Sequence, residues 1–192
     1  MSGRWLDIGL VRTVLCGLVA AGIVHIVVTL ATPYFAGAGI VQRLAEHLPQ
    51  NSMLVTGVPT PQSQLLPYQE ADMVFGLCSY DVRNTPVVVR AVLPGSGWTL
   101  SLYSPAGENF YFMPGQDQRP LEINAMLIAG DSDAILPADP RVGSARLTTV
   151  RVPAASGLMM IRAPLKGESF RAETEAALRR ASCAPMAKPA SS

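Results

Sequence analysis

Few side chains in this chain of 192 residues have the type and spacing that catalysis requires. A hydrolase needs a nucleophile beside a base, and histidine, the commonest base, occurs only at positions 25 and 47. No Gly-x-Ser-x-Gly motif is present, and Gly95-Ser96-Gly97 belongs to a turn sequence. His47 falls in a predicted surface helix, where a histidine is ordinarily just solvated. The sequence therefore predicts no catalytic residue.

Metal ligands and cofactor motifs are equally sparse. The sequence has no Cys-x-x-Cys pair and no cluster of His and Cys, so no zinc site is expected. Asp131, Asp133 and Asp139 resemble a calcium loop, but the glycine and bidentate glutamate of an EF-hand are missing. We interpret these aspartates as turn formers. No phosphate-binding or dinucleotide-binding glycine motif occurs, so no metal and no cofactor is predicted.

Polar and aromatic side chains of the predicted strands form a candidate ligand face. They are Tyr80, Asp81, Thr99, Ser101, Tyr103 and Tyr111. If they meet on one side of a sheet, they would line a groove for a small ligand, a role that suits amphipathic aromatic residues. The alternative is an ordinary solvated sheet face with tyrosines at its rim.

Cys78 and Cys183 form a candidate disulfide. Both follow the apolar N-terminal run described next, and an oxidising compartment beyond a membrane would allow them to bond. The bond would tie the C-terminal segment to the central sheet. The alternative is two separate buried thiols. Cys16 lies inside the apolar run and is interpreted as a small apolar residue.

The run from Thr13 to Thr32 contains no charged side chain. As a helix it extends over about 30 Å, the thickness of the hydrocarbon core of a bilayer. We predict a transmembrane helix over residues 13–33. A cleaved signal peptide is the main alternative, with Ala36-Gly37-Ala38 as its cleavage site. The length of the run and the aromatic pair Tyr34-Phe35 at its end favour a retained anchor.

The charges on either side of this run predict its orientation. Arg4 and Arg12 precede it with Asp7 as the sole acid, and the next charge is Arg43. The more basic flank belongs in the cytoplasm. Residues 1–12 are therefore expected to be cytoplasmic, and the chain after the helix is expected across the membrane.

Gly17, Ala21 and His25 are spaced four apart and share one face of the predicted transmembrane helix. Small residues at this spacing allow two helices to approach closely in lipid, and an ionisable residue there usually faces protein or water. We predict a candidate interface with a second copy or with another membrane protein. The alternative is a neutral His25 bonded within its own helix, beside small residues that are merely common in such segments.

The remaining composition indicates one β-rich domain. The net charge is +1 and only 15% of residues are charged, without a basic cluster, so nucleic acid is a poor partner. Sixteen glycines and sixteen prolines divide the chain into short segments, which favours strands. We expect strands at residues 53–58, 72–80, 86–93, 98–103, 109–113, 121–129, 147–152 and 157–163. The fourth and fifth should form a hairpin, and the last two should pair with each other.

Helices are expected at both ends of this domain. Residues 34–48 predict an amphipathic juxtamembrane helix that either lies on the membrane surface or packs under the domain. A C-terminal helix should begin at Ser169 as its cap and end near Arg180. Its expected buried residues are Phe170, Thr174, Ala177 and Leu178. Residues 185–192 have nothing to bury and are expected to be disordered.

Several segments together resemble a known bacterial family. They are Cys78-Ser-Tyr-Asp81, Thr85-Pro-Val-Val-Val89, Trp98-Thr-Leu-Ser-Leu-Tyr103, Asn109-Phe-Tyr111 and Arg180-Ala-Ser-Cys183. The chain is similar to the short membrane-anchored form of domain-of-unknown-function family 1254, a sister of family 1214. The resemblance implies a β-sandwich-like domain in the envelope of a Gram-negative bacterium, and no reaction, cofactor or catalytic residue. An Asn-x-Asp-Thr-x-Tyr-like motif of longer members is missing, so no activity tied to it is transferred.

These features together predict a mainly β, α+β protein of the bacterial inner membrane. One transmembrane helix would leave the N-terminus in the cytoplasm and place a β-sandwich-like domain, residues 49–184, in the periplasm. We expect a non-catalytic role in binding or envelope assembly. The alternative is a ligand-binding or enzymatic domain that uses the face containing Tyr80 and Asp81.

Overall fold

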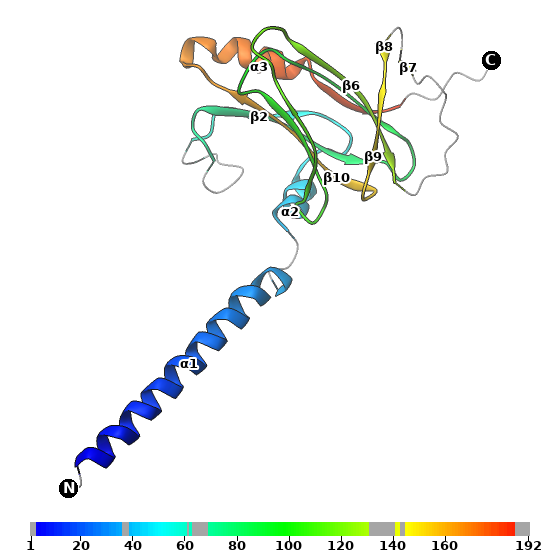
Figure 1. Ribbon diagram of the computed structural model, residues 1–192. Helices are drawn as coiled ribbons and strands as arrows, with labels where there is room; N and C mark the ends of the chain where they lie inside the picture. Colours follow the sequence, from blue (N-terminus) through cyan, green and yellow to red (C-terminus); the bar gives the residue numbers. More distant parts are fainter. Residues whose placement is uncertain are drawn as a thin grey trace. The chain divides into compact units, whose positions relative to one another are not determined.

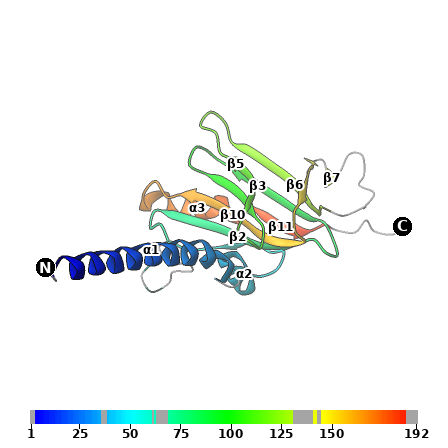
Figure 2. The same ribbon diagram turned by 60° about the horizontal axis from the view of Figure 1, so that its bottom comes forward.

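The computed structural model describes residues 3–35, 39–60, 62, 69–130, 141–142 and 145–186. The chain divides into two compact units, Met1–Gly37 and Ala38–Ser192. Figures 1 and 2 show the helix of the first unit and the layered sheets of the second. The candidate cleavage site at residues 36–38, the three aspartates of the calcium-like loop and the tail from residue 187 lie outside the described residues.

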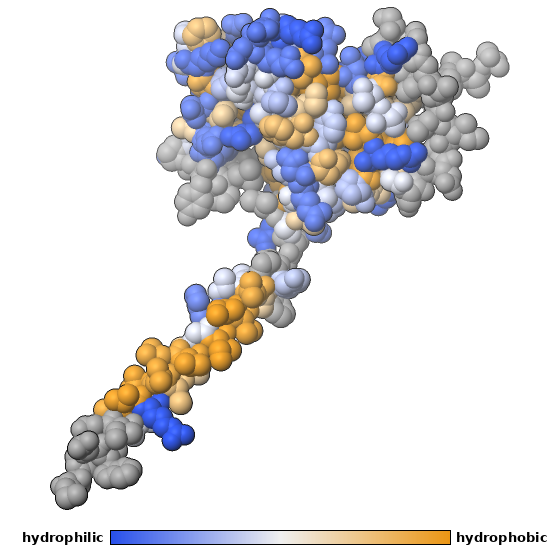
Figure 3. Space-filling view, viewed as in Figure 1, coloured by the Kyte–Doolittle hydropathy of each residue, from blue (hydrophilic) through white to orange (hydrophobic). Residues whose placement is uncertain are grey.

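The first unit is one continuous helix, α1 (Gly3–Phe35). Its segment Gly9–Thr32 has a mean hydropathy of 2.5, which fits a membrane span or a signal sequence. Figure 3 shows the apolar surface of this helix. Thr13, Thr29 and Thr32 each donate a hydroxyl hydrogen bond to the carbonyl four residues earlier, at 3.0, 2.7 and 2.7 Å. These polar groups are therefore satisfied within the helix, as a lipid environment requires.

The second unit contains two main sheets. The five-stranded sheet has the order β1 (Leu54–Val55), β2 (Met73–Asp81), β10 (Ser156–Pro164), β4 (Thr99–Tyr103), β5 (Asn109–Pro114). The four-stranded sheet has the order β11 (Ser182–Pro185), β3 (Val87–Leu93), β6 (Leu121–Ala129), β9 (Thr148–Val152). Two further short strands, β7 (Arg141–Val142) and β8 (Ala145–Arg146), pair antiparallel with each other. The predicted mainly β, α+β class is confirmed.

The main core lies between the two sheets. Alternate residues of β2, β10 and β4 face inward, among them Cys78, Met159 and Leu102. They meet inward residues of the other sheet such as Val89 and Leu127. Both groups are buried apolar side chains, so the period-two alternation of each strand explains the sandwich.

A helix covers the other face of the five-stranded sheet. In α2 (Ile40–His47) and the residue that follows it, Val41, Leu44 and Leu48 are buried against Phe75 and Leu158 of the sheet. The helical spacing of these apolar residues explains the contact. Of the two predicted positions for this helix, packing on the domain is therefore the one observed.

The C-terminal helix differs from its prediction at its start. Residues Glu168–Phe170 form a 3₁₀ turn, η1, before α3 (Arg171–Arg179). No side chain caps α3, so the predicted role of Ser169 is wrong. Thr174 is buried as expected, but Phe170 is 47% exposed because it lies in the turn before the helix. The expected burial of Phe170 is also wrong.

The last two predicted strands do not pair with each other. β9 lies parallel to β6 at one edge of the four-stranded sheet. β10 instead runs between β2 and β4, antiparallel to both, at the centre of the five-stranded sheet. The short connection crosses from one sheet to the other because β10 has apolar residues on both faces and is buried between the core and α2. The hairpin of β4 with β5 is confirmed.

A disulfide bond joins the two sheets. Cys78 of β2 is bonded to Cys183 of β11, with 6.4 Å between their Cα atoms. The two cysteines are 105 residues apart in sequence, so the bond closes most of the sandwich into one loop. β11 pairs with β3 and was not predicted, and Pro185 at its end is a strand residue, where the sequence predicted disorder.

Candidate functional site

The predicted ligand face is divided between the two sides of the five-stranded sheet. Ser101 of β4 is opposite Met160 of β10, which is opposite Leu77 of β2. Alternation from these pairs places Asp81, Thr99, Ser101 and Tyr103 on the face that α2 covers. Tyr111 is opposite Leu102, and Tyr80 is two residues from Cys78, so both tyrosines face the core. The prediction that all six meet on one face is therefore wrong.

Tyr80 is a packing residue of the core. Its side chain is fully buried, and its hydroxyl donates a hydrogen bond to the carbonyl oxygen of Tyr103, at 3.3 Å. Gly157 is the partner of Tyr80 across the strands, and a Cβ at Gly157 would overlap both that hydroxyl and that carbonyl oxygen. Burial raises the pKa of Tyr80 above its usual value, so the phenol is neutral near pH 7.

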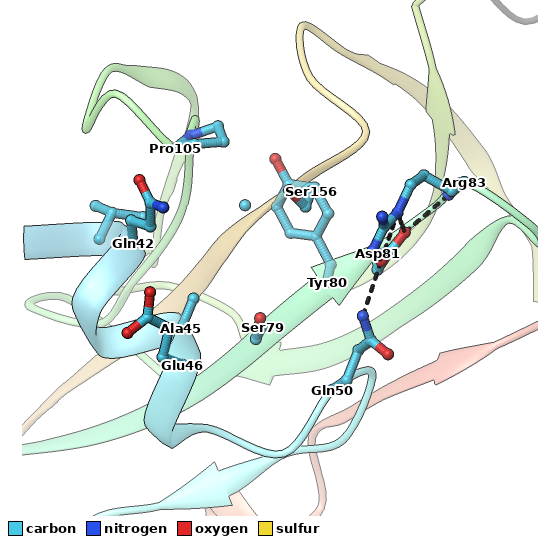
Figure 4. A pocket seen from close by; sticks show the side chains of 12 residues that line it. Gln42, Ala45, Glu46, Gln50, Ser79, Tyr80, Asp81, Arg83, Pro105 and Ser156 are labelled. Carbon is cyan, nitrogen blue, oxygen red and sulfur yellow. Dashed lines mark hydrogen bonds and ion pairs between the residues drawn. The ribbon is translucent and has the colours of Figure 1, made fainter. Parts of the chain in front are cut away.

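Asp81 is the centre of a dense hydrogen-bond cluster at the end of β2 (Figure 4). Its Oδ1 accepts hydrogen bonds from the Arg83 backbone N–H and from Nε, both at 3.0 Å. Its Oδ2 accepts a hydrogen bond from Gln50 Nε2 at 2.8 Å and forms an ion pair with Arg83 Nη2. Both carboxylate oxygens are thus occupied by donors.

Asn51 holds the backbone of Asp81 from the other side. Its amide oxygen accepts from the N–H of Asp81 at 2.8 Å, and its amide nitrogen donates to the carbonyl of Asp81 at 3.1 Å. The backbone of Asn51 has a φ of 50°, a left-handed conformation that asparagine tolerates better than most residues. The cluster is therefore built from two segments about thirty residues apart.

This arrangement keeps Asp81 ionised. The hydrogen bond from Arg83 lowers the pKa of the carboxyl below its usual value, burial opposes that shift, and Gln50 adds to it. A general acid or base working near neutral pH needs a pKa raised toward 7. Asp81 has the opposite shift and no free oxygen, so it organises the local structure.

A polar hollow of about 250 Å³ lies beside this cluster, between α2 and the ends of β2 and β10. Figure 4 shows α2 along one side and the strands that carry Tyr80 and Ser156 on the other. Its polar lining includes Gln42, Glu46, Gln50, Ser79, Arg83 and Ser156. Of the predicted face, only Tyr80 and Asp81 reach it. The other polar residues were missed, since they come from four segments whose meeting no local pattern indicates.

The model of the family described as protein of unknown function (DUF1254) matches residues 50–185. The chain belongs to this family. Its fold is similar to that of the VPA0106 protein from Vibrio parahaemolyticus, at 14% identity and a TM-score of 0.56 over 79% of this chain. A putative uncharacterized protein from Burkholderia cenocepacia is 12% identical, with a TM-score of 0.39 over 62% of this chain. No curated protein matches.

This DUF1254 chain spans 38% of the length of the Vibrio protein and 34% of that of the Burkholderia protein. At 14% identity the likeness to the first of these shows a shared fold and nothing of its activity. The family match begins at residue 50, after α2, so it concerns the sandwich and not α1.

The candidate helix interface lies wholly in α1. Gly17, Ala21 and His25 are exposed along one helix, and a Cβ at Gly17 would meet no atom within 4 Å. The carbonyl of His25 accepts the hydroxyl of Thr29. The interface therefore stays a prediction. For metals, no group of three His, Cys, Asp or Glu side chains suited to an ion occurs in the part of the chain that the structure describes.

Proposed function

We propose that this DUF1254 protein is a single-pass inner-membrane protein with a cytoplasmic N-terminus and a periplasmic β-sandwich. The disulfide between Cys78 and Cys183 carries the proposal, because cytosolic thiols are kept reduced and bridges persist in exported domains. The 24-residue apolar segment of α1 supports it, as do Arg4 and Arg12 on its N-terminal side.

The role that fits this sandwich best is binding or envelope assembly without catalysis. Asp81 carries the buried carboxylate beside the hollow, and this carboxylate accepts hydrogen bonds from Arg83 and Gln50. The stripe of Gly17, Ala21 and His25 supplies a surface for a second membrane helix, from another copy or another protein. The lipid bilayer is the first partner, and a membrane protein is the second.

The polar hollow supports a second candidate function, the binding of a small hydrophilic ligand. Amides, hydroxyls, the two carboxylates of Glu46 and Asp81 and the guanidinium of Arg83 line its volume of about 250 Å³. The side chain of Arg83 remains 66% exposed although it pairs with Asp81, so its free N–H groups face the solvent at the edge of the hollow. A ligand with several hydrogen-bonding groups would suit this lining.

Reporter fusions after Ser192 test the location. We expect the fusion to a reporter that folds only in the periplasm to be active. The fusion to a reporter that works only in the cytosol should be inactive. Activity only of the cytosolic reporter would contradict the proposal. Crosslinking in native membranes tests the role: a stoichiometric protein partner supports assembly, and a solitary protein that copurifies with a metabolite supports ligand binding.

Substitution in the helix stripe tests the membrane contact. Gly17→Ile with Ala21→Ile should abolish a crosslinked partner, because the larger side chains keep two helices apart. Leu18→Ile with Gly22→Ile, on another face of the helix, is the matched control and should leave crosslinking unchanged. Equal crosslinking in all three proteins would exclude the stripe as the contact.

A further inference from the structure

A second groove, separate from the hollow at Asp81, lies between α3 and the turn that joins β3 to β4. It has a volume of about 260 Å³. Its apolar walls are Pro94, Trp98, Pro164 and Phe170. Gly97 shapes this wall, since its φ of 82° turns the chain back and a Cβ there would lie 2.9 Å from Pro164 Cγ. The turn thus packs directly on the end of β10.

Two aromatic residues of the groove differ in burial. Trp98 is 7% exposed and belongs to the main core, whereas Phe170 is 47% exposed in the turn before α3. Both residues line the groove, so a ligand there meets the exposed ring of Phe170 and the small accessible part of Trp98. Aromatic rings attract one another in offset-stacked or edge-to-face arrangements, so a planar aromatic ligand suits this lining.

Thr174 places an unpaired hydroxyl at this groove. The residue is only 7% exposed and lines the groove, but its hydroxyl has no hydrogen-bond partner among the described residues. The threonines of α1 behave differently, since Thr13, Thr29 and Thr32 all bond to a carbonyl of their own helix. The hydroxyl oxygen is in contact with solvent, so a ligand acceptor would take the place of water there and contribute the modest affinity of one hydrogen bond.

Three charged groups surround the groove. Lys166 and Arg180 form no ion pair within the described residues, and neither does Glu173. The other arginines of α3 are paired: Arg171 with Glu168, and Arg179 with Glu175. Two cations and one carboxylate leave the lining with a single net positive charge, which complements one negative charge on a ligand.

We propose that this groove binds a monoanionic aryl carboxylate. The ring lies against Trp98 and Phe170, and the carboxylate accepts hydrogen bonds from the Thr174 hydroxyl and from Lys166 or Arg180. Phe170, Lys166 and Arg180 are exposed at the groove, and the largely buried Trp98 offers only the edge that lines it. The proposal concerns a different surface from the polar hollow, and it holds in whichever compartment the sandwich lies.

The fluorescence of Trp98 reports on this site. The chain has two tryptophans, so Trp5→Phe leaves Trp98 as the sole indole. The full chain in lipid nanodiscs is titrated with 3-phenylpropionate and with 3-phenylpropionamide, a neutral compound of the same shape. We expect saturable millimolar binding of the carboxylate and binding roughly tenfold weaker for the amide, as the loss of a charged hydrogen bond predicts.

Variants separate the site from a general apolar surface. Thr174→Val should weaken carboxylate binding several-fold, and so should Lys166→Gln combined with Arg180→Gln, while Arg179→Gln, the paired neighbour, should leave it unchanged. Thermal unfolding of each variant without ligand checks that the fold is kept. Equal affinity for acid and amide, equal affinity in all variants, or no saturation at tens of millimolar would each overturn the proposal.

Discussion

At the scale of single residues, the sandwich depends on close contacts that admit few substitutions. Gly157 allows the Tyr80 hydroxyl to reach the backbone of Tyr103 across β10. Asp81 receives donors on both carboxylate oxygens from Arg83 and Gln50. One contact depends on the lack of a side chain and the other on a charge, so substitutions should affect them in different ways.

Gly157→Ala should destabilise the domain by about 1–3 kcal/mol, the usual effect of overpacking a closed site. The added Cβ would overlap the Tyr80 hydroxyl and the Tyr103 carbonyl. Thermal and urea unfolding of the full chain in detergent measure the change. Gly57→Ala is the control, since a Cβ at Gly57 meets nothing within 4 Å. A stability equal to that of the parent protein would show that the overlap is not real.

Asp81→Asn should lower the free energy of unfolding at pH 7 by about 1–3 kcal/mol, because it weakens charge-assisted hydrogen bonds. The pKa of Asp81 is lowered in the folded protein, chiefly by Arg83. A lowered carboxyl pKa stabilises the fold above the unfolded value, near 3.9, and this contribution disappears as the pH falls through the folded value. The difference between the parent protein and the variant should therefore shrink below about pH 4.

Unfolding curves between pH 3 and pH 8 measure this effect. Glu46→Gln is the matched control, because Glu46 is an exposed carboxylate of the same hollow. Its stability difference from the parent protein should be small at pH 7. A deficit of Asp81→Asn that stays constant through pH 3 would argue against an ionised Asp81 as the source.

At the scale of elements, α2 is part of the folded domain, in which it covers the outer face of β2 and β10. Three apolar residues at helical spacing make this contact, and all three are less than 10% exposed. Ser101 and Tyr103 lie on the same outer face, where Ser101 is buried and Tyr103 is half-buried. α2 and its neighbours therefore leave little of this face as an open groove. The position of α2 also forms one wall of the hollow beside Asp81.

Leu44→Ala should cost about 2–5 kcal/mol of stability, as expected for a fully buried leucine that leaves a cavity. Leu44 is 6% exposed and packs in the cluster that contains Phe75 and Leu158. Gln42→Ala on the exposed side of α2 should change stability by less than about 0.5 kcal/mol. Chemical unfolding of both variants gives the comparison. A neutral Leu44→Ala would mean that α2 is not docked on the sheet.

At the scale of the whole molecule, a disulfide cross-links the two sheets. It joins β2 of one sheet to β11 of the other, beside residues of the main core. The longer the loop that a bond closes, the more conformational freedom the unfolded chain loses. A separation of 105 residues is long for a domain of this size.

Removal of the bond should lower the stability of the sandwich by about 2–5 kcal/mol. Cys78→Ala with Cys183→Ala removes it without leaving a reactive thiol, and reduction of the parent protein should give a similar loss. Cys16→Ala, outside the sandwich, is the control and should change neither stability nor mobility on a non-reducing gel. Unfolding that is insensitive to reductant would show that the two thiols are not bonded in the mature protein.

The local features of this protein follow from its sequence. The length and apolar composition of α1, the alternation of β4 and the helical spacing in α2 depend on residues close together in the chain. Periodicity therefore predicts each of them. The mainly β class follows from the same local patterns. The pairing of β4 with β5 follows because a short turn leaves neighbouring strands few other partners.

Only the tertiary structure decides which distant segments meet. Tyr80 and Asp81 are neighbours in sequence, but alternation puts one in the core and the other against residues 50–51, which lie thirty residues earlier. β9 and β10 are also neighbours, and burial of both faces of β10 separates them into different sheets. The candidate grooves form where such segments converge, since the energy that selects these contacts is the burial of apolar surface over the whole domain.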